Sequence, residues 1–89
     1  MSKEVEVSKY FKDFKITKAV LTYIFSGTHI KTGLPIIFRI NNQNTSIDFL
    51  YYERIKDEVA KLNKKEKEDM FNEILEINKG LFLAVKDLD

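Results

Sequence analysis

The spacing of hydrophobic residues changes along the chain, and this change limits the fold more than any other feature of the sequence. From Leu34 to Ile40 every second residue is a large apolar one, and Pro35 and Arg39 lie between them. A spacing of two is typical of a strand with one buried face. Val20–Phe25 is rich in β-branched and aromatic residues, which favours a second strand. We therefore expect a β-hairpin within residues 17–40, or a meander with Thr28–Lys31 as a brief middle strand.

Helical spacing is found on both sides of this region. Within residues 2–14, apolar residues recur at i, i+3, i+4 and i+7, which predicts a short amphipathic helix; they are Val7, Tyr10, Phe11 and Phe14. Within residues 45–62, a similar stripe with steps of four and three predicts a longer helix; it consists of Ile47, Tyr51, Ile55, Val59 and Leu62.

A second helix is expected after this one. Asn63 and Glu66 have the spacing of a capping box, and Met70, Ile74 and Ile77 follow on one face. Gly80 suits the residue just past a helix end, so we expect the helix to stop there. The short apolar run Leu81–Val85 then favours a closing strand, with a last helical turn as the alternative.

These elements predict one α+β domain over residues 1–89. We expect an N-terminal helix, a small antiparallel hairpin or three-stranded meander, and two C-terminal helices packed on one face of the sheet. A mostly helical fold with a minor hairpin is the alternative.

Composition favours a cytoplasmic protein. The chain has no cysteine, whereas small secreted domains usually depend on disulfides. No apolar signal segment is found at the N-terminus, and the longest nearly apolar stretch, Ala19–Phe25, is far shorter than the roughly 20 residues of a membrane span. Abundant Lys, Ile and Asn suit an AT-rich genome, such as that of a phage or a low-GC bacterium.

The charge is nearly balanced overall but polarised along the chain. Net charge is +1, which gives no strong reason to expect a nucleic acid or a membrane as partner. Residues 1–44 hold seven basic and three acidic side chains, whereas residues 45–89 hold eight basic and eleven acidic ones. This distribution points to contact surfaces rather than to chemistry.

The residues that most catalytic and metal sites need are scarce. His29 is the single histidine, and no acid lies near it in sequence. We interpret it as a solvated or locally hydrogen-bonded turn residue. With one His and no Cys, a zinc site is not expected. The three glycines form neither a phosphate-binding loop nor a dinucleotide-binding fingerprint. We therefore expect no enzyme activity, no catalytic or metal-binding residues and no cofactor.

Two sets of residues are candidates for binding a protein. Phe49 and Tyr52 point away from the apolar stripe of the helix expected at 45–62, so they are either core residues or an exposed interface. Four carboxylates spaced by three and four would form an acidic face on the following helix; they are Glu66, Asp69, Glu73 and Glu76. A solvated helix face is the simpler interpretation of that row.

A basic row near the N-terminus supports a different class of function. Lysines every three residues alternate with aromatic residues, as on surfaces that bind single-stranded nucleic acid; they are Lys9, Lys12, Lys15 and Lys18. The same rings are also needed for a core.

Taken together, the sequence predicts a small non-enzymatic protein-binding module, a modulator or inhibitor that acts through surface contacts with a protein partner. A nucleic-acid-binding regulator that uses the basic row is the alternative. A thin sheet also has an edge to cover, so a homodimer is a further expected assembly.

Overall fold

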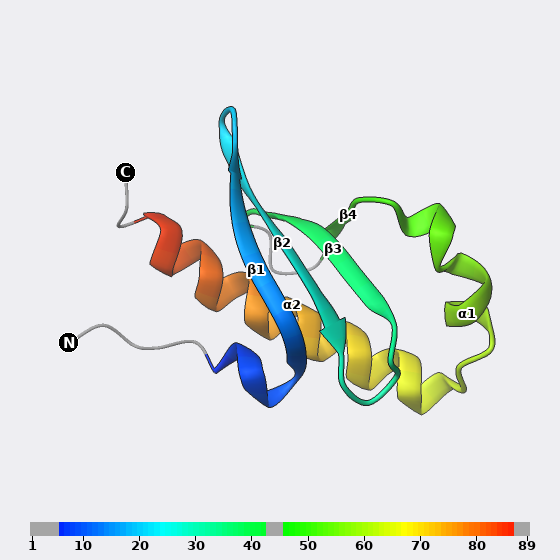
Figure 1. Cartoon of the computed structure of the whole chain (residues 1–89). Helices are drawn as coiled ribbons and strands as arrows, with labels where there is room; N and C mark the ends of the chain where they lie inside the picture. The colour runs from blue at the N-terminus through cyan, green and yellow to red at the C-terminus, as the bar shows by residue number, and fades with distance from the viewer. Residues whose placement is uncertain (1–5, 43–45, 87–89) are drawn as a thin grey trace.

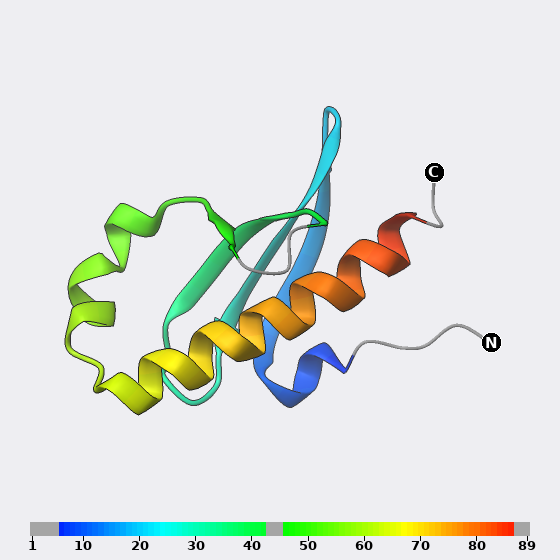
Figure 2. The ribbon, with the colours of Figure 1, turned by 180° about the vertical axis from the view of Figure 1, so that it is seen from behind.

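The computed structural model describes residues 6–42 and 46–86, and it confirms an α+β fold. A four-stranded antiparallel sheet has the order β1-β2-β3-β4, and one long helix, α2, crosses one of its faces (Figures 1 and 2). The elements in chain order are η1 (Val7–Lys9), β1 (Phe11–Ala19), β2 (Thr22–His29), β3 (Pro35–Ile40), β4 (Asp48–Phe49), η2 (Tyr52–Arg54), α1 (Lys56–Ala60) and α2 (Lys64–Lys86).

The expected hairpin is present as β2 and β3. Phe25 pairs with Phe38, and Gly27 pairs with Ile36, so these positions share the face that α2 covers. Residues 30–34 form the connection, where Gly33 takes a positive φ of 73°. Thr28 and His29 belong to β2, so the alternative middle strand is absent from this part of the chain.

The prediction of a helix within residues 2–14 is wrong for residues 6–14, the part that the structure describes. Val7–Lys9 form a single 3-10 turn, and a nine-residue strand begins at Phe11. The pairing of β1 with β2 shifts between Lys12 and Lys15, where Asp13 has a φ of 51°. This β-bulge adds one residue to the strand, so Phe11 and Phe14, three positions apart, both lie on the α2 side. A bulged strand therefore reproduced the spacing of a helix.

The helix expected at 45–62 is also wrong. Its described part divides into β4, η2 and α1, and the break occurs at Tyr51, which takes a left-handed φ of 58°. Ile55 and Val59 are buried as the stripe predicted, but Tyr51 is 59% exposed. The apolar stripe therefore identified the buried residues of α1 correctly, but it does not continue as one helix across the break at Tyr51.

The helix after Asn63 is confirmed and is longer than expected. Glu66 accepts a hydrogen bond from the Asn63 backbone N–H, and its own N–H donates to the Asn63 side chain, which forms the predicted capping box. The strand expected at Leu81–Val85 is wrong, because α2 continues through Gly80 to Lys86. Leu81 and Val85 are buried on the same face as the preceding turns.

The core lies between the sheet and α2. Sheet residues and helix residues that are almost fully enclosed face each other there, namely Phe11, Phe25, Ile36 and Phe38 against Met70, Ile74 and Ile77. Buried Asn78 fixes the end of β3 to the helix: it accepts a hydrogen bond from the Asn41 N–H and donates one to the Asn41 carbonyl. The described core is thus one apolar layer with polar ties at its ends.

Candidate functional site

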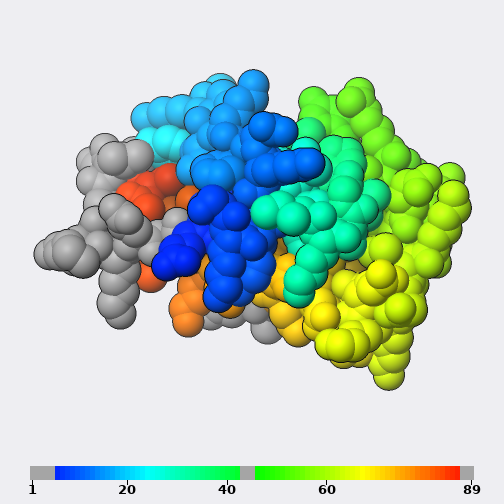
Figure 3. All heavy atoms as spheres, turned by 60° about the horizontal axis from the view of Figure 1, so that its bottom comes forward, coloured from blue at the N-terminus to red at the C-terminus, as the bar shows by residue number. Residues whose placement is uncertain are grey.

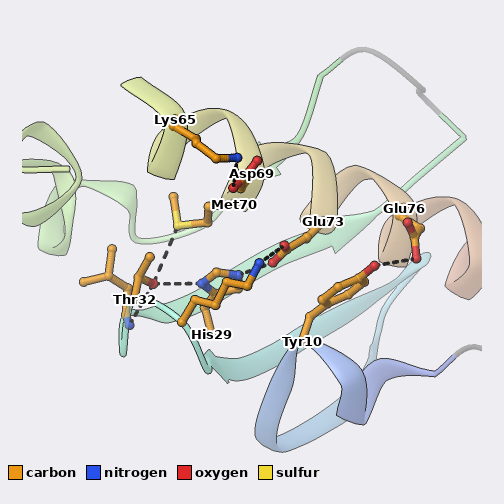
Figure 4. A network of polar contacts seen from close by, with 10 residues as sticks. Tyr10, His29, Thr32, Lys65, Asp69, Met70, Glu73 and Glu76 are labelled. Atoms are coloured by element: carbon orange, nitrogen blue, oxygen red, sulfur yellow. Dashed lines mark hydrogen bonds and ion pairs between the residues drawn. The ribbon is translucent and has the colours of Figure 1, made fainter. Parts of the chain in front are cut away.

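His29 belongs to a polar network that links the β2–β3 turn to α2 (Figure 4). One ring nitrogen, Nε2, lies 2.7 Å from Glu73 Oε1, and the other, Nδ1, lies 2.9 Å from the Thr32 hydroxyl. The second Glu73 oxygen accepts a hydrogen bond from Lys31 Nζ at 3.1 Å. This hydrogen bond, followed by the charge of Glu73, raises the pKa of Lys31.

The order hydroxyl–imidazole–carboxylate resembles a catalytic triad in its connections. The Thr32 hydroxyl, however, accepts a hydrogen bond from the Leu34 N–H and donates one to the Met70 sulfur. The His29 side chain is 1% exposed and that of Glu73 is 12% exposed. The group therefore joins a turn to a helix from within. Of the two interpretations of His29, solvated or locally hydrogen-bonded, the structure supports the second, since the ring bonds to Thr32 three residues later. It also bonds to Glu73, 44 positions later, which the sequence did not predict.

Each of the four carboxylates of the predicted acidic row on α2 has a partner within the molecule. Glu66 caps the helix, Asp69 pairs with Lys65 at 3.1 Å, and Glu76 accepts a hydrogen bond from the Tyr10 hydroxyl. Glu73 is taken up by the His29 network. Across residues 6–42 and 46–86, no three His, Asp or Glu side chains are grouped as metal ligands. The four carboxylates therefore make separate contacts within the domain and do not act together as one acidic face.

Phe49 and Tyr52 come together in a cluster on the edge of the core. Their ring centroids are 5.6 Å apart, and Phe49 meets Phe71 edge to face at 5.7 Å. Both residues are partly buried against the core. Of the two interpretations of these rings, packing within the domain is the one that these contacts favour.

A cleft lies between the β1–β2 hairpin and the end of α2, and it was not predicted from the sequence. It has a volume of about 570 Å³, with Tyr23 and Ile40 on the sheet side and Phe82 and Val85 on the helix side. Two lysines, Lys18 and Lys86, also line it. Its volume falls within the range of ligand pockets, about 300–1,000 Å³.

The tip of the hairpin lies beside this cleft and projects beyond the rest of the sheet (Figure 1). It consists of Val20 and Leu21, which are 92% and 95% exposed, more than any other large apolar residue of the described chain. We expected both within a strand, because β-branched and aliphatic residues there look like core residues. Only the pairing of Ala19 with Thr22 places them in the turn.

The basic row runs along η1 and β1. Lys9 lies in η1, whereas Lys12 and Lys15 pair with Thr28 and Ser26 on the sheet face opposite α2. Lys18 pairs with Tyr23, and its Nζ lies 5.7 Å from the centroid of that ring.

The rings that alternate with these lysines are used by the fold. Phe11 is 1% exposed, and Tyr10 bonds to Glu76 through its hydroxyl. Phe14 stacks on Phe25 on the α2 side of the sheet. The lysines are accessible, but Phe11 is buried and Tyr10 and Phe14 are held by contacts within the domain, so these rings are not presented together as a base-stacking surface would require.

Comparison of the chain with protein-family models, with characterised proteins and with solved structures gave no match. Among the helices of the described residues, none combines the length and the apolar character that a bilayer crossing requires.

Proposed function

We propose that this chain is a non-enzymatic protein-binding module that modulates or inhibits its partner by surface contact. The contact surface is the hairpin tip, Val20 and Leu21, together with the cleft beside it. The observation that carries this proposal is the nearly complete exposure of the two tip side chains. We also propose that it acts in the cytoplasm, since a chain without cysteine suits a reducing compartment.

Folding alone does not account for the residues at the tip. Two-residue hairpin turns usually favour Asn-Gly, Asp-Gly or Gly-containing pairs, which accept a positive φ. Neither Val20 nor Leu21 takes a positive φ, and neither contributes to the core. Complete burial of one such side chain stabilises by about 1.5–3 kcal/mol. That free energy is available to a partner that covers the tip.

A protein fits this surface better than a small molecule. The cleft could hold a ligand by size, but Val20 and Leu21, which line its outer end, remain almost completely exposed on the tip. An occupant that covers both needs an extended contact surface. Lys18 and Lys86 at the cleft favour carboxylates on that partner.

The test compares the wild type with Val20→Ser/Leu21→Ser. The matched control is Leu83→Ser, which removes another apolar side chain, 55% exposed, from α2. Each immobilised protein is exposed to lysate of its own source cells, and captured proteins are quantified by mass spectrometry. Circular dichroism confirms that all three proteins are folded.

We expect one protein to be enriched by the wild type and by Leu83→Ser, and to be lost with the tip variant. Removal of two anchoring apolar contacts costs roughly 2–4 kcal/mol, enough to reduce capture by more than tenfold. If the tip variant captures the same proteins in the same amounts, this surface is not the binding site.

A further inference from the structure

The free edge of β1 extends the surface at the hairpin tip, and it has a defined chemistry. We propose that β1 accepts an extended segment of the partner by strand addition, and that this segment alternates acidic and apolar residues. This inference rests on the proposed function, because the tip that anchors the partner directly follows the same strand.

The sheet order leaves β1 at an edge, with β2 as its strand neighbour within the described chain. The atoms of η1 and β1, in blue, lie at the front of the molecule in Figure 3. Alternate peptide groups on the outer side of an edge strand are available to another strand. The bulge at Asp13 interrupts regular pairing, so the usable edge is residues 14–19, about 20 Å at roughly 3.3 Å per residue.

The two faces of this edge differ in chemistry, and the difference defines the partner. On the face opposite α2, Lys15 and Thr17 project beside Ser26 and Ile24 of β2. On the α2 side, Phe14 and Ile16 are each 41% exposed, and Lys18 follows them beside Tyr23 at the end nearest the tip. An added strand presents side chains alternately to the two faces. A carboxylate then meets Lys15 on one face, and apolar side chains cover Phe14 and Ile16 on the other.

A second copy of this chain fits the edge poorly. An antiparallel pair of β1 strands brings Lys15 and Lys18 of each copy together along one short shared edge, and like charges placed close together across strands are destabilising. Lysines on an edge strand commonly protect it against such self-pairing. The same lysines attract a strand that bears carboxylates, so the edge discriminates between the two occupants.

The probe is a fluorescent peptide of about eight residues that alternates glutamate with valine. Two control peptides separate the contributions: one has the same residues in two blocks, and the other has the same alternation with N-methyl groups on alternate residues. The block peptide keeps the charge, and the methylated peptide keeps the side chains but cannot pair as a strand. Binding is measured by anisotropy and located by amide NMR shifts.

The charge test uses Lys12→Glu/Lys15→Glu. Its matched control is Lys64→Glu/Lys79→Glu, which makes the same change of net charge with exposed lysines of α2. We expect the alternating peptide to bind the wild type and the control with amide shifts in residues 14–19, and to bind the β1 variant about tenfold more weakly. Binding weakens from about 50 mM to about 500 mM salt, because the lysines are exposed. Both control peptides bind at least tenfold more weakly than the alternating peptide.

Four results overturn the proposal. One is no binding of the alternating peptide, and another is equal binding of all three peptides. The third is dimerisation of the free protein through the β1 edge, seen by sedimentation. The fourth is salt-dependent binding of a short oligouridylate to residues 14–19, tighter than that of the peptide, which favours the nucleic-acid function. If any one of these results occurs while capture of the partner still depends on Val20 and Leu21, strand addition is wrong and the protein-binding function stands.

Discussion

Gly27 is the position where one added methyl group has the clearest expected effect. It lies in β2, and a Cβ placed there would be 2.8 Å from the Phe14 Cβ and 3.1 Å from the Phe25 Cζ. The first distance is shorter than real Cβ contacts allow, so β1 must shift away from β2. The glycine thus makes room for Phe14 to stack on Phe25, with ring centroids 6.2 Å apart.

Gly27→Ala is therefore destabilising. Overpacking costs about 1–3 kcal/mol, and the loss of backbone freedom in the unfolded chain returns about 0.4–1 kcal/mol. The net decrease in the free energy of unfolding is about 1–2 kcal/mol, which lowers Tm by about 4–16 °C in a domain of this size. Urea and thermal unfolding followed by circular dichroism measure both quantities.

Two backgrounds at position 14 test the steric cause. Phe14→Ala keeps the Cβ that collides, so the penalty of Gly27→Ala stays within about 0.5 kcal/mol of its wild-type value. Phe14→Gly removes that atom, and the penalty falls by at least half. A neutral or stabilising Gly27→Ala, or an equal penalty in all three backgrounds, refutes the reasoning.

Two further substitutions test the polar contacts at the two ends of the core, Asn78 with Asn41 and Lys31 with Glu73. Asn78→Ala removes both hydrogen bonds to the Asn41 backbone and should lower the free energy of unfolding by about 1–3 kcal/mol; equal urea midpoints for it and for Asn72→Ala, an exposed control on α2, would contradict this. The raised pKa of Lys31 means that its contribution to stability is complete below its ordinary pKa of 10.5 and is lost as pH rises through the higher folded value. The stability difference between wild type and Lys31→Met should therefore be constant from about pH 7 to about pH 10 and shrink above that; a difference that shrinks below pH 10 would contradict it.

Sequence spacing predicted elements well where one regular element continued. The alternation at Leu34–Ile40 gave β3, and the capping residues Asn63 and Glu66 gave the start of α2. At the other end of α2, the stripe of Ile74 and Ile77 continues in phase to Leu81 and Val85. A glycine in a helix costs only about 1 kcal/mol, so the buried stripe outweighed Gly80 as a stop signal.

Spacing failed where the backbone itself departs from regularity. The bulge at Asp13 and the left-handed Tyr51 both have positive φ, which non-glycine residues adopt uncommonly. Neither an aspartate nor a tyrosine in a sequence predicts such a conformation. The helical spacing of Phe11 and Phe14 and the stripe through Tyr51 were therefore consistent with helices, although neither segment forms the helix expected of it.

The His29 network depended on contacts that sequence separation conceals. Our expectation considered acids close to His29 along the chain, whereas Glu73 reaches it from α2, across the core layer. His29 pairs with Phe11, and both side chains are buried on the α2 side of the sheet. Once the pairing is known, a polar partner on α2 is required, since a buried imidazole needs hydrogen bonds. The pairing register was thus the missing information.

The same register makes the exposure at the hairpin tip unavoidable. Pairing of Phe25 with Phe38 keeps alternate residues of β2 against α2, and a slip by one residue would move all of them to the opposite face. The turn is therefore fixed at Val20 and Leu21 by the core, not by its own residues. The fold cannot cover these side chains without giving up the packing of Phe25, and a polar pair would serve the turn equally well. The presence of two exposed apolar side chains at this point is the reason to look for the partner there.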